Sequence, residues 1–199
     1  MTKKPQRASL GQIRIIGGKW RGRKLPVPDS TGLRPTTDRV RETLFNWLMP
    51  TIQGARCLDC FSGSGALGFE ALSRYASHAT FIEYERNVAK QLSANLATLS
   101  AENAHVVQGN ALQYLNSIGT PFDVIFLDPP FRQGMLAETI NLLETRGWLA
   151  EESWIYVEAE AESAATEVPT NWQLHREKIA GQVAYRLYIR HPQSGVQTA

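Results

Sequence analysis

The segment Asp128-Pro129-Pro130-Phe131 places a carboxylate, two rigid rings and an aromatic side chain directly after the apolar run at 124–127. Proline fixes φ near −65°, so the Pro129 carbonyl is aimed in one direction. Together with the carboxylate it can accept both N–H bonds of a nucleobase amine, while the aromatic ring stacks on the base. Two acceptors localise the lone pair of that amine and stabilise the cation formed as it attacks a methyl carbon. The segment therefore predicts a site for methylating a base amine; the alternative is a rigid loop that only ends a strand.

A glycine-rich loop stands earlier in the chain, where Gly63, Gly65 and Gly68 have the spacing G-x-G-x-x-G between a predicted strand and a predicted helix. Glycines there let the backbone turn tightly and approach a ligand closely. Glu83, at the end of the next predicted strand, can accept hydrogen bonds from two ribose hydroxyls. Both features are shared by proteins that bind NAD, FAD or S-adenosylmethionine (AdoMet).

Asp59 helps to separate these cofactors. A carboxylate at the entrance of the loop repels a pyrophosphate, but it suits the ammonium and sulfonium groups of AdoMet; the alternative is a carboxylate that caps the loop. Asn110 follows the third predicted strand, where its amide can contact the adenine edge, cap a helix, or do both. Cys57 and Cys60 face opposite sides of a strand and no second Cys/His pair has suitable spacing, so we predict no metal site.

The charge is distributed unevenly along the 199 residues. Residues 1–50 hold eleven Lys/Arg against three Asp/Glu, whereas residues 51–199 hold ten against sixteen, so a net charge of +2 conceals a basic arm on an acidic body. Basic residues interleaved with Trp20 suit phosphate neutralisation with base stacking, although Trp20 can equally pack beneath a hairpin. A polyanion, and RNA in particular, is the expected partner.

Strand and helix patterns alternate from residue 55, which predicts a Rossmann-like α/β fold with a mostly parallel sheet covered on both faces. The predicted strands are 55–60, 79–84, 104–108, 122–127 and 153–158, followed by a hairpin at 172–179 and 182–190, and the predicted helices are 65–75, 86–99, 110–117 and 134–146. In such a sheet, ligands bind beyond the carboxyl ends of the strands where the strand order reverses. Gly63 and Asp128 are therefore expected to face one crevice.

We predict three regions: a basic arm at 1–50, a catalytic domain at 51–191 and a mobile tail at 192–199. The arm should contain a hairpin turning at Gly17-Gly18 and a helix whose N-cap is Thr36 or Thr37. No apolar run is long enough to cross a membrane and no secretory signal opens the chain, so we expect a cytoplasmic monomer.

The motifs RIIGGKWRGRKL, RPTTDRVRETLFNWL and FLDPPF, with DCFSGSGALG, together resemble the RsmD family of class I AdoMet-dependent methyltransferases. The resemblance covers about residues 12–190. It implies transfer of a methyl group to the N2 amine of a guanine in 16S rRNA, guanine 966 by family resemblance, during maturation of the small ribosomal subunit. It also implies a seven-stranded sheet whose last strand is antiparallel, and a helix after residue 36 that covers AdoMet.

The predicted site residues fall into three sets. The residues expected to hold the target base are Asp128, Pro129, Pro130 and Phe131. Those expected to bind AdoMet are Thr37, Asp59, Phe61, Ser62, Gly63, Gly65, Glu83, Tyr84, Asn110, Ala111 and Asp128. Those expected to bind RNA are Lys19, Trp20, Arg21, Arg23, Lys24, Arg34, Arg39 and Arg41, where Arg39 and Arg41 can reach either RNA or the carboxylate of the cofactor.

Three other functions remain open from the sequence alone. A DNA adenine-N6 or cytosine-N4 methyltransferase uses the same proline-braced loop, but a chain of 199 residues leaves little room for a DNA-recognition domain. A non-catalytic RNA-binding assembly factor would not need Asp59, Glu83 and Asp128. An NAD-linked oxidoreductase would share the glycine loop and leave the DPPF segment unexplained.

Overall fold

A seven-stranded sheet organises the protein. The computed structural model describes residues 11–28, 36–130, 134–161 and 167–192. Its central strands are β3 (Arg56–Asp59), β4 (His78–Glu83), β5 (Ala104–Gln108), β6 (Phe122–Leu127), β7 (Leu149–Glu160), β8 (Trp172–Ala180) and β9 (Val183–Arg190), in the spatial order β5-β4-β3-β6-β7-β9-β8. Strands β3 to β7 run parallel, and β9 pairs antiparallel with both β7 and β8. The predicted sheet, including its antiparallel last strand, is confirmed.

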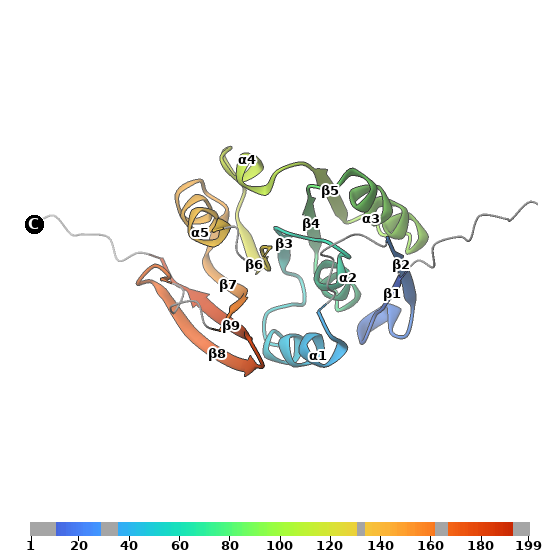
Figure 1. Ribbon diagram of the computed structural model, residues 1–199, viewed down its shortest axis with the longest axis horizontal. Helices are drawn as coiled ribbons and strands as arrows, with labels where there is room; N and C mark the ends of the chain where they lie inside the picture. The colour runs from blue at the N-terminus through green and yellow to red at the C-terminus, as the bar shows by residue number, and fades with distance from the viewer. Residues whose placement is uncertain (1–10, 29–35, 131–133, 162–166, 193–199) are drawn as a thin grey trace, which may run out of the picture.

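Helices cover both faces of this sheet. The helices are α1 (Asp38–Trp47), α2 (Ala66–Ser73), α3 (Arg86–Thr98), α4 (Ala111–Leu115) and α5 (Met135–Thr145). One core joins α1, α2 and α3 to the sheet, and a second core joins α4 and α5 to its other face. Figure 1 shows α1 and α2 on one side of the row of strands and α4 and α5 on the other. Among the helices that the structure describes, none has the length and apolar character needed to span a lipid bilayer.

Strand β6 illustrates why the sequence forms this arrangement. Val124 and Phe126 enter the core that contains α1, whereas Ile125 and Leu127 enter the core that contains α5, and all four side chains are fully buried. A strand covered on both faces needs apolar residues at every position, which the unbroken run provides. The α1 ring of Phe45 lies 6.0 Å from the ring of Phe126, so α1 packs directly against β6.

The N-terminal hairpin differs from its predicted form. Strands β1 (Gly11–Arg14) and β2 (Lys24–Val27) pair antiparallel, and the segment between them contains a short 3-10 helix at Gly18–Trp20. The predicted turn at Gly17-Gly18 is wrong, because the segment between the two strands docks on α2 and does not form a tight hairpin turn. The Trp20 N–H donates to the Ser73 hydroxyl at 3.0 Å, and a Cβ atom on Gly18 would stand 1.9 Å from the Ser73 carbonyl oxygen.

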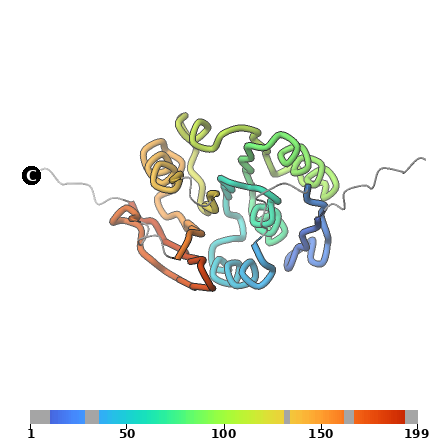
Figure 2. Tube along the Cα trace, in the orientation of Figure 1, coloured from blue at the N-terminus to red at the C-terminus, as the bar shows by residue number. Residues whose placement is uncertain are grey.

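The hairpin and α1 belong to the same core as the sheet. Ile13, Ile15 and Leu25 of the hairpin and Leu44 of α1 are buried together with residues of α2 and α3. Figure 2 shows the hairpin at the end of the molecule opposite to β8 and β9. The Thr37 side chain accepts a hydrogen bond from the Val40 N–H at 3.3 Å, which confirms the predicted N-cap of α1. The boundary proposed at residue 50 stays a prediction.

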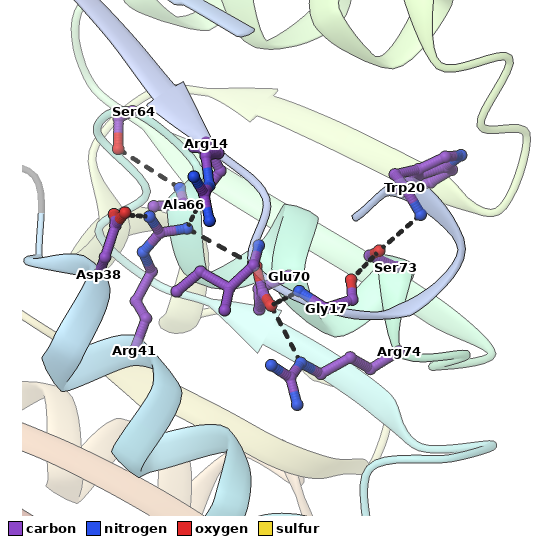
Figure 3. Close-up of polar contacts among 11 residues, drawn as sticks. Arg14, Gly17, Trp20, Asp38, Arg41, Ser64, Ala66, Glu70, Ser73 and Arg74 are labelled. Carbon is purple, nitrogen blue, oxygen red and sulfur yellow. Dashed lines mark hydrogen bonds and ion pairs between the residues drawn. The ribbon is translucent and has the colours of Figure 1, made fainter. Parts of the chain in front are cut away.

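The buried carboxylate of Glu70 on α2 holds these elements together. It accepts hydrogen bonds from the backbone N–H groups of Ile16 at 3.0 Å and Gly17 at 2.9 Å. The Arg74 guanidinium donates to it at 3.0 Å, and the guanidinium of Arg41 lies 3.6 Å away (Figure 3). Because Glu70 is fully buried, the two cations and two N–H groups replace the water that its charge has lost.

We predict that Glu70→Ala destabilises the protein by about 3–5 kcal/mol, because the substitution leaves two backbone N–H groups unpaired and removes the buried negative charge that faces Arg41 and Arg74. Urea unfolding of the purified protein measures this change. The matched control is Glu42→Ala, an exposed glutamate on α1, which should change stability by less than about 0.5 kcal/mol. Similar unfolding midpoints for Glu70→Ala and the control would contradict the account.

Candidate active site

The tips of β3 and β6 lie side by side. Asp59 pairs with Phe126, and the Cys60 N–H donates to the Phe126 carbonyl at 3.2 Å. The strand order reverses between these two strands, since β4 and β5 follow on one side and β7 on the other. The glycine loop after β3 and Asp128 after β6 therefore share one edge of the sheet, as the sequence predicted.

The glycines of the loop have separate physical reasons. Gly63 and Gly65 take positive φ angles of 52° and 78°, which L side chains rarely adopt. A Cβ atom on Gly65 would lie 2.6 Å from Leu92 and Phe69, and one on Gly68 would lie 2.3 Å from the Phe81 ring. The loop thus turns sharply and allows α2 to pack closely on the sheet.

Glu83 ties the glycine loop to the neighbouring strand tip. Its carboxylate accepts the Gly63 N–H at 2.7 Å and the Glu85 N–H at 3.1 Å. A carboxylate offers about four acceptor positions, so both oxygens keep capacity for ribose hydroxyls. The carboxylate that would bind the ribose is therefore held in position before any ligand arrives.

Asp59 is a buried acid with one oxygen left over. Its side chain is 3% exposed, and Oδ2 has no hydrogen-bond partner. Burial raises the pKa of Asp59 to about 7, the negative charge of Glu83 adds to the rise, and the N–H groups of Gly68 and Phe61 oppose it. An unpaired oxygen at the base of a glycine loop is suited to a cationic ligand. A positive charge nearby would lower the pKa of Asp59 and so restore its charged carboxylate form.

Asp128 follows the end of β6 and is half-buried. Burial raises the pKa of Asp128 well above its usual range, and the charges of Glu158 and Asp59 raise it further. Pro129 is buried and Pro130 is exposed. Phe131 lies outside the described residues.

The acid that the sequence analysis missed is Glu158, at the end of β7. Burial raises the pKa of Glu158, and a hydrogen bond from the Tyr156 hydroxyl to Oε2 at 3.1 Å opposes the rise. The sequence signal was its position two residues before the end of a strand that neighbours β6. Recognising it required the strand order, which the sequence pattern alone does not give.

The remaining predicted cofactor residues occupy the same edge of the sheet. Asn110 is the N-cap of α4 and accepts the Gln113 N–H at 3.0 Å, which confirms its capping role; the contact with adenine stays a prediction. Ala111, the first residue of α4, is buried, and Tyr84, which directly follows β4, is exposed. Ser62 is buried and donates to the Asp59 carbonyl at 3.0 Å, while Phe61 is half-buried.

Two predicted RNA-binding residues are buried instead. Trp20 is 8% exposed and packs in the core, with the Lys19 ammonium 4.6 Å from its ring centre. Arg41 is 2% exposed, and it donates to the Arg14 carbonyl at 2.8 Å and to Asp38 at 2.6 Å as well as facing Glu70. Neither side chain is available to RNA, because tertiary packing on α2 encloses both of them.

The other predicted RNA-binding residues are exposed where the structure describes them, namely Lys19, Arg21, Arg23, Lys24 and Arg39. Arg34 lies outside the described residues. The turn between β1 and β2 contacts Ser73 at the end of α2 and, through Arg23, the Thr98 carbonyl at the end of α3. Both helices begin at the edge that carries the glycine loop, so the basic turn lies about 12–20 Å from that edge. RNA that contacts both must span this distance.

No group of three His, Cys, Asp or Glu side chains in the described ranges is arranged to hold a metal ion. Both cysteines are buried and free.

A glycine loop after the first strand of a seven-stranded sheet with one antiparallel strand defines the class I methyltransferase fold. The structure of a precorrin-6y C5,15-methyltransferase from Geobacter metallireducens shares this fold, with a TM-score of 0.61 at 17% identity over 83% of this chain and 93% of that one.

The chain belongs to the family described as "Conserved hypothetical protein 95", whose model matches residues 13–189. It is 68% identical over 96% of both chains to "Ribosomal RNA small subunit methyltransferase D" of Escherichia coli K12, and 53% identical to the protein of that name from Haemophilus influenzae, over 89% of this chain and 94% of that one. The structure of a "putative methyltransferase yhhF" from Escherichia coli matches with a TM-score of 0.88 at 69% identity, over 92% of this chain and all of that one.

We predict that the substitution Asp59→Asn makes the stability of the ligand-free protein less dependent on pH. A carboxyl whose pKa is raised by folding stabilises the protein below its unfolded pKa, and that stability is lost as the pH rises from about 3.8 through about 7. Urea unfolding at pH 5 and pH 8 should show a smaller loss for Asp59→Asn than for the unchanged protein. Equal losses would contradict the assigned environment; Glu102→Gln, an exposed position, is the control.

Proposed function

We infer that the chain is a methyltransferase that acts on small-subunit ribosomal RNA. The relatives from Escherichia coli and Haemophilus influenzae carry the name of such an enzyme, and they match this chain over 96% and 89% of its length. We propose further that the methyl donor is AdoMet and that the acceptor is the N2 amine of a guanine in 16S rRNA. The observation that carries the proposal is the placement of Asp59 and Asp128 at neighbouring strand tips.

The described residues fit AdoMet. The unpaired Oδ2 of Asp59 suits its cationic groups, the Glu83 carboxylate suits the ribose hydroxyls, and Asn110 can contact the adenine. When bound, AdoMet supplies a methyl group on a positively charged sulfur. Thr37, exposed at the start of α1, is proposed to contact it from above the loop.

The acceptor amine is proposed to lie against Asp128 and the Pro129 carbonyl. These two acceptors hold its N–H bonds so that the nitrogen lone pair points toward the methyl carbon. Bound AdoMet would supply the methyl carbon to this nitrogen, and its sulfur would keep the electron pair of the broken carbon–sulfur bond. The nitrogen then carries positive charge, which the Asp128 carboxylate stabilises until the proton leaves.

The base must reach this pocket from a folded RNA. A base inside a duplex is inaccessible, so the target is proposed to lie in a loop or to be flipped out, at a cost of a few kcal/mol. The exposed Lys19, Arg21 and Arg23 are proposed to bind phosphates 12–20 Å away, which reduces that cost by holding the surrounding RNA. A ribosomal substrate agrees with the predicted cytoplasmic location. That location and the monomeric state both stay predictions.

We predict that Asp128→Ala lowers methyl transfer by about 10²–10⁴-fold while AdoMet still binds, because the substitution removes an acceptor that acts on the base. Transfer of labelled methyl groups to rRNA and to small-subunit particles gives the first quantity, and calorimetry with AdoMet gives the second. Asp123→Ala, at the opposite end of β6, is the control and should retain activity. Loss of AdoMet binding in Asp128→Ala would show that Asp128 serves the cofactor instead.

We predict that Arg21→Glu together with Arg23→Glu weakens RNA binding and makes it less sensitive to salt. Each lost phosphate contact should reduce the slope of log affinity against log salt by about 0.7–0.9. Titration of labelled rRNA at several salt concentrations measures the slope. Arg146→Glu, an exposed residue after α5, is the control, and a slope equal to that of the control would remove the arm from the RNA interface.

A further inference from the structure

Two carboxylates stand next to each other on neighbouring strands. Leu127 of β6 pairs with Val157 of β7, so the next residues along, Asp128 and Glu158, are neighbours at about the 4.8 Å spacing of strands. Phe126 and Tyr156, two residues earlier, both enter the core that contains α1. Since side chains alternate along a strand, Asp128 and Glu158 point to that same face.

The row of side chains continues across the sheet from this pair. Glu158 pairs with Tyr185 of β9, and Tyr185 pairs with Lys178 of β8. Tyr185 and Lys178 line a groove between α1 and the sheet, together with Tyr156 of β7 and with Thr43 and Trp47 of α1. Asp128 and Glu158 do not line this narrow groove, so the carboxylate pair stands at the strand tips beside it.

The two carboxylates have no cation to neutralise them within the described residues. Neither Asp128 nor Glu158 forms an ion pair there, and the three-residue clusters that would hold a metal ion are absent from the same residues. The Tyr156 hydroxyl holds one oxygen of Glu158 at 3.1 Å and thereby fixes its direction. Two half-buried acids of like charge are costly unless a ligand brings hydrogen-bond donors to them.

We propose that Glu158 is a second base-binding residue, which accepts the N1–H of the target guanine while Asp128 and the Pro129 carbonyl accept its N2 protons. Guanine presents N–H donors at both N1 and N2, whereas adenine has an acceptor at N1 and no amine at C2. The carboxylate pair therefore selects guanine, and this selection rests on the proposed role of Asp128.

The test replaces the target guanine in the rRNA with 2-aminopurine, which keeps the N2 amine but has no N1–H. The unchanged enzyme should methylate guanine about 10–100-fold more efficiently, measured as kcat/KM, because 2-aminopurine turns an acceptor toward a carboxylate. In Glu158→Gln the amide can donate to N1 of 2-aminopurine, so the preference should fall at least tenfold. A preference that stays the same in Glu158→Gln would overturn the proposal.

A second readout tests whether the two carboxylates are electrostatically coupled in the working enzyme. Removing the charge of Glu158 lowers the pKa of Asp128, so the acidic limb of the kcat/KM profile should move to lower pH in Glu158→Gln. The control Glu151→Gln, at the other end of β7, should change neither the base preference nor the profile. An acidic limb that stays in place would show that the two carboxylates do not interact, which would remove the pair on which the proposal depends.

Two outcomes distinguish a wrong role for Glu158 from a wrong acceptor site at Asp128. If Asp128→Ala abolishes methyl transfer while Glu158→Gln keeps the full preference for guanine, the role of Glu158 is wrong and that of Asp128 stands. If Asp128→Ala leaves methyl transfer unchanged, the proposed acceptor site is wrong, and the assignment of Glu158 falls with it.

Discussion

The buried carboxylate of Glu70 is the constraint on which the arrangement of the molecule depends. The Glu70 side chain on α2 accepts hydrogen bonds from the backbone N–H groups of Ile16 and Gly17 in the N-terminal hairpin. It also faces the guanidinium groups of Arg41 on α1 and Arg74 on its own helix. A fully buried charge requires all of its lone pairs to be satisfied, so the hairpin and α1 have only one favourable position. That position places α1 over β6 and β7, where it forms one wall of the groove beside the candidate acceptor site.

The same helix connects the basic turn with the candidate cofactor site. It begins at the glycine loop and ends at Ser73, whose hydroxyl both accepts the Trp20 N–H and donates to the Gly17 carbonyl at 2.6 Å. The basic turn is therefore fixed to one end of α2 and the glycine loop to the other. If RNA binds to both regions, the protein measures a set distance along its substrate, which favours folded ribosomal RNA over a short single strand.

The sheet could be predicted from the sequence because its signals are local. Apolar runs such as 122–127 and glycines at strand ends specify strands and tight turns whatever surrounds them. The positions of Trp20 and Arg41 could not be predicted in this way. An aromatic ring or a guanidinium has the same pattern in sequence whether it meets RNA or the side of a helix, and here contacts with Ser73 and Glu70, more than 25 residues away, decide the outcome. Glu158 was missed for a related reason, since its partner Asp128 becomes a neighbour only through strand pairing.

The central claim is that a methyl donor bound at the β3 tip meets a guanine amine bound at the β6 tip. Its most direct test is a crystal structure of the protein with S-adenosylhomocysteine and an rRNA fragment that contains the target. The account predicts that the sulfur faces the N2 amine across a gap that one methyl group fills, with that nitrogen about 3–3.5 Å from the methyl position. A guanine bound elsewhere, or a sulfur directed away from Asp128, would contradict it.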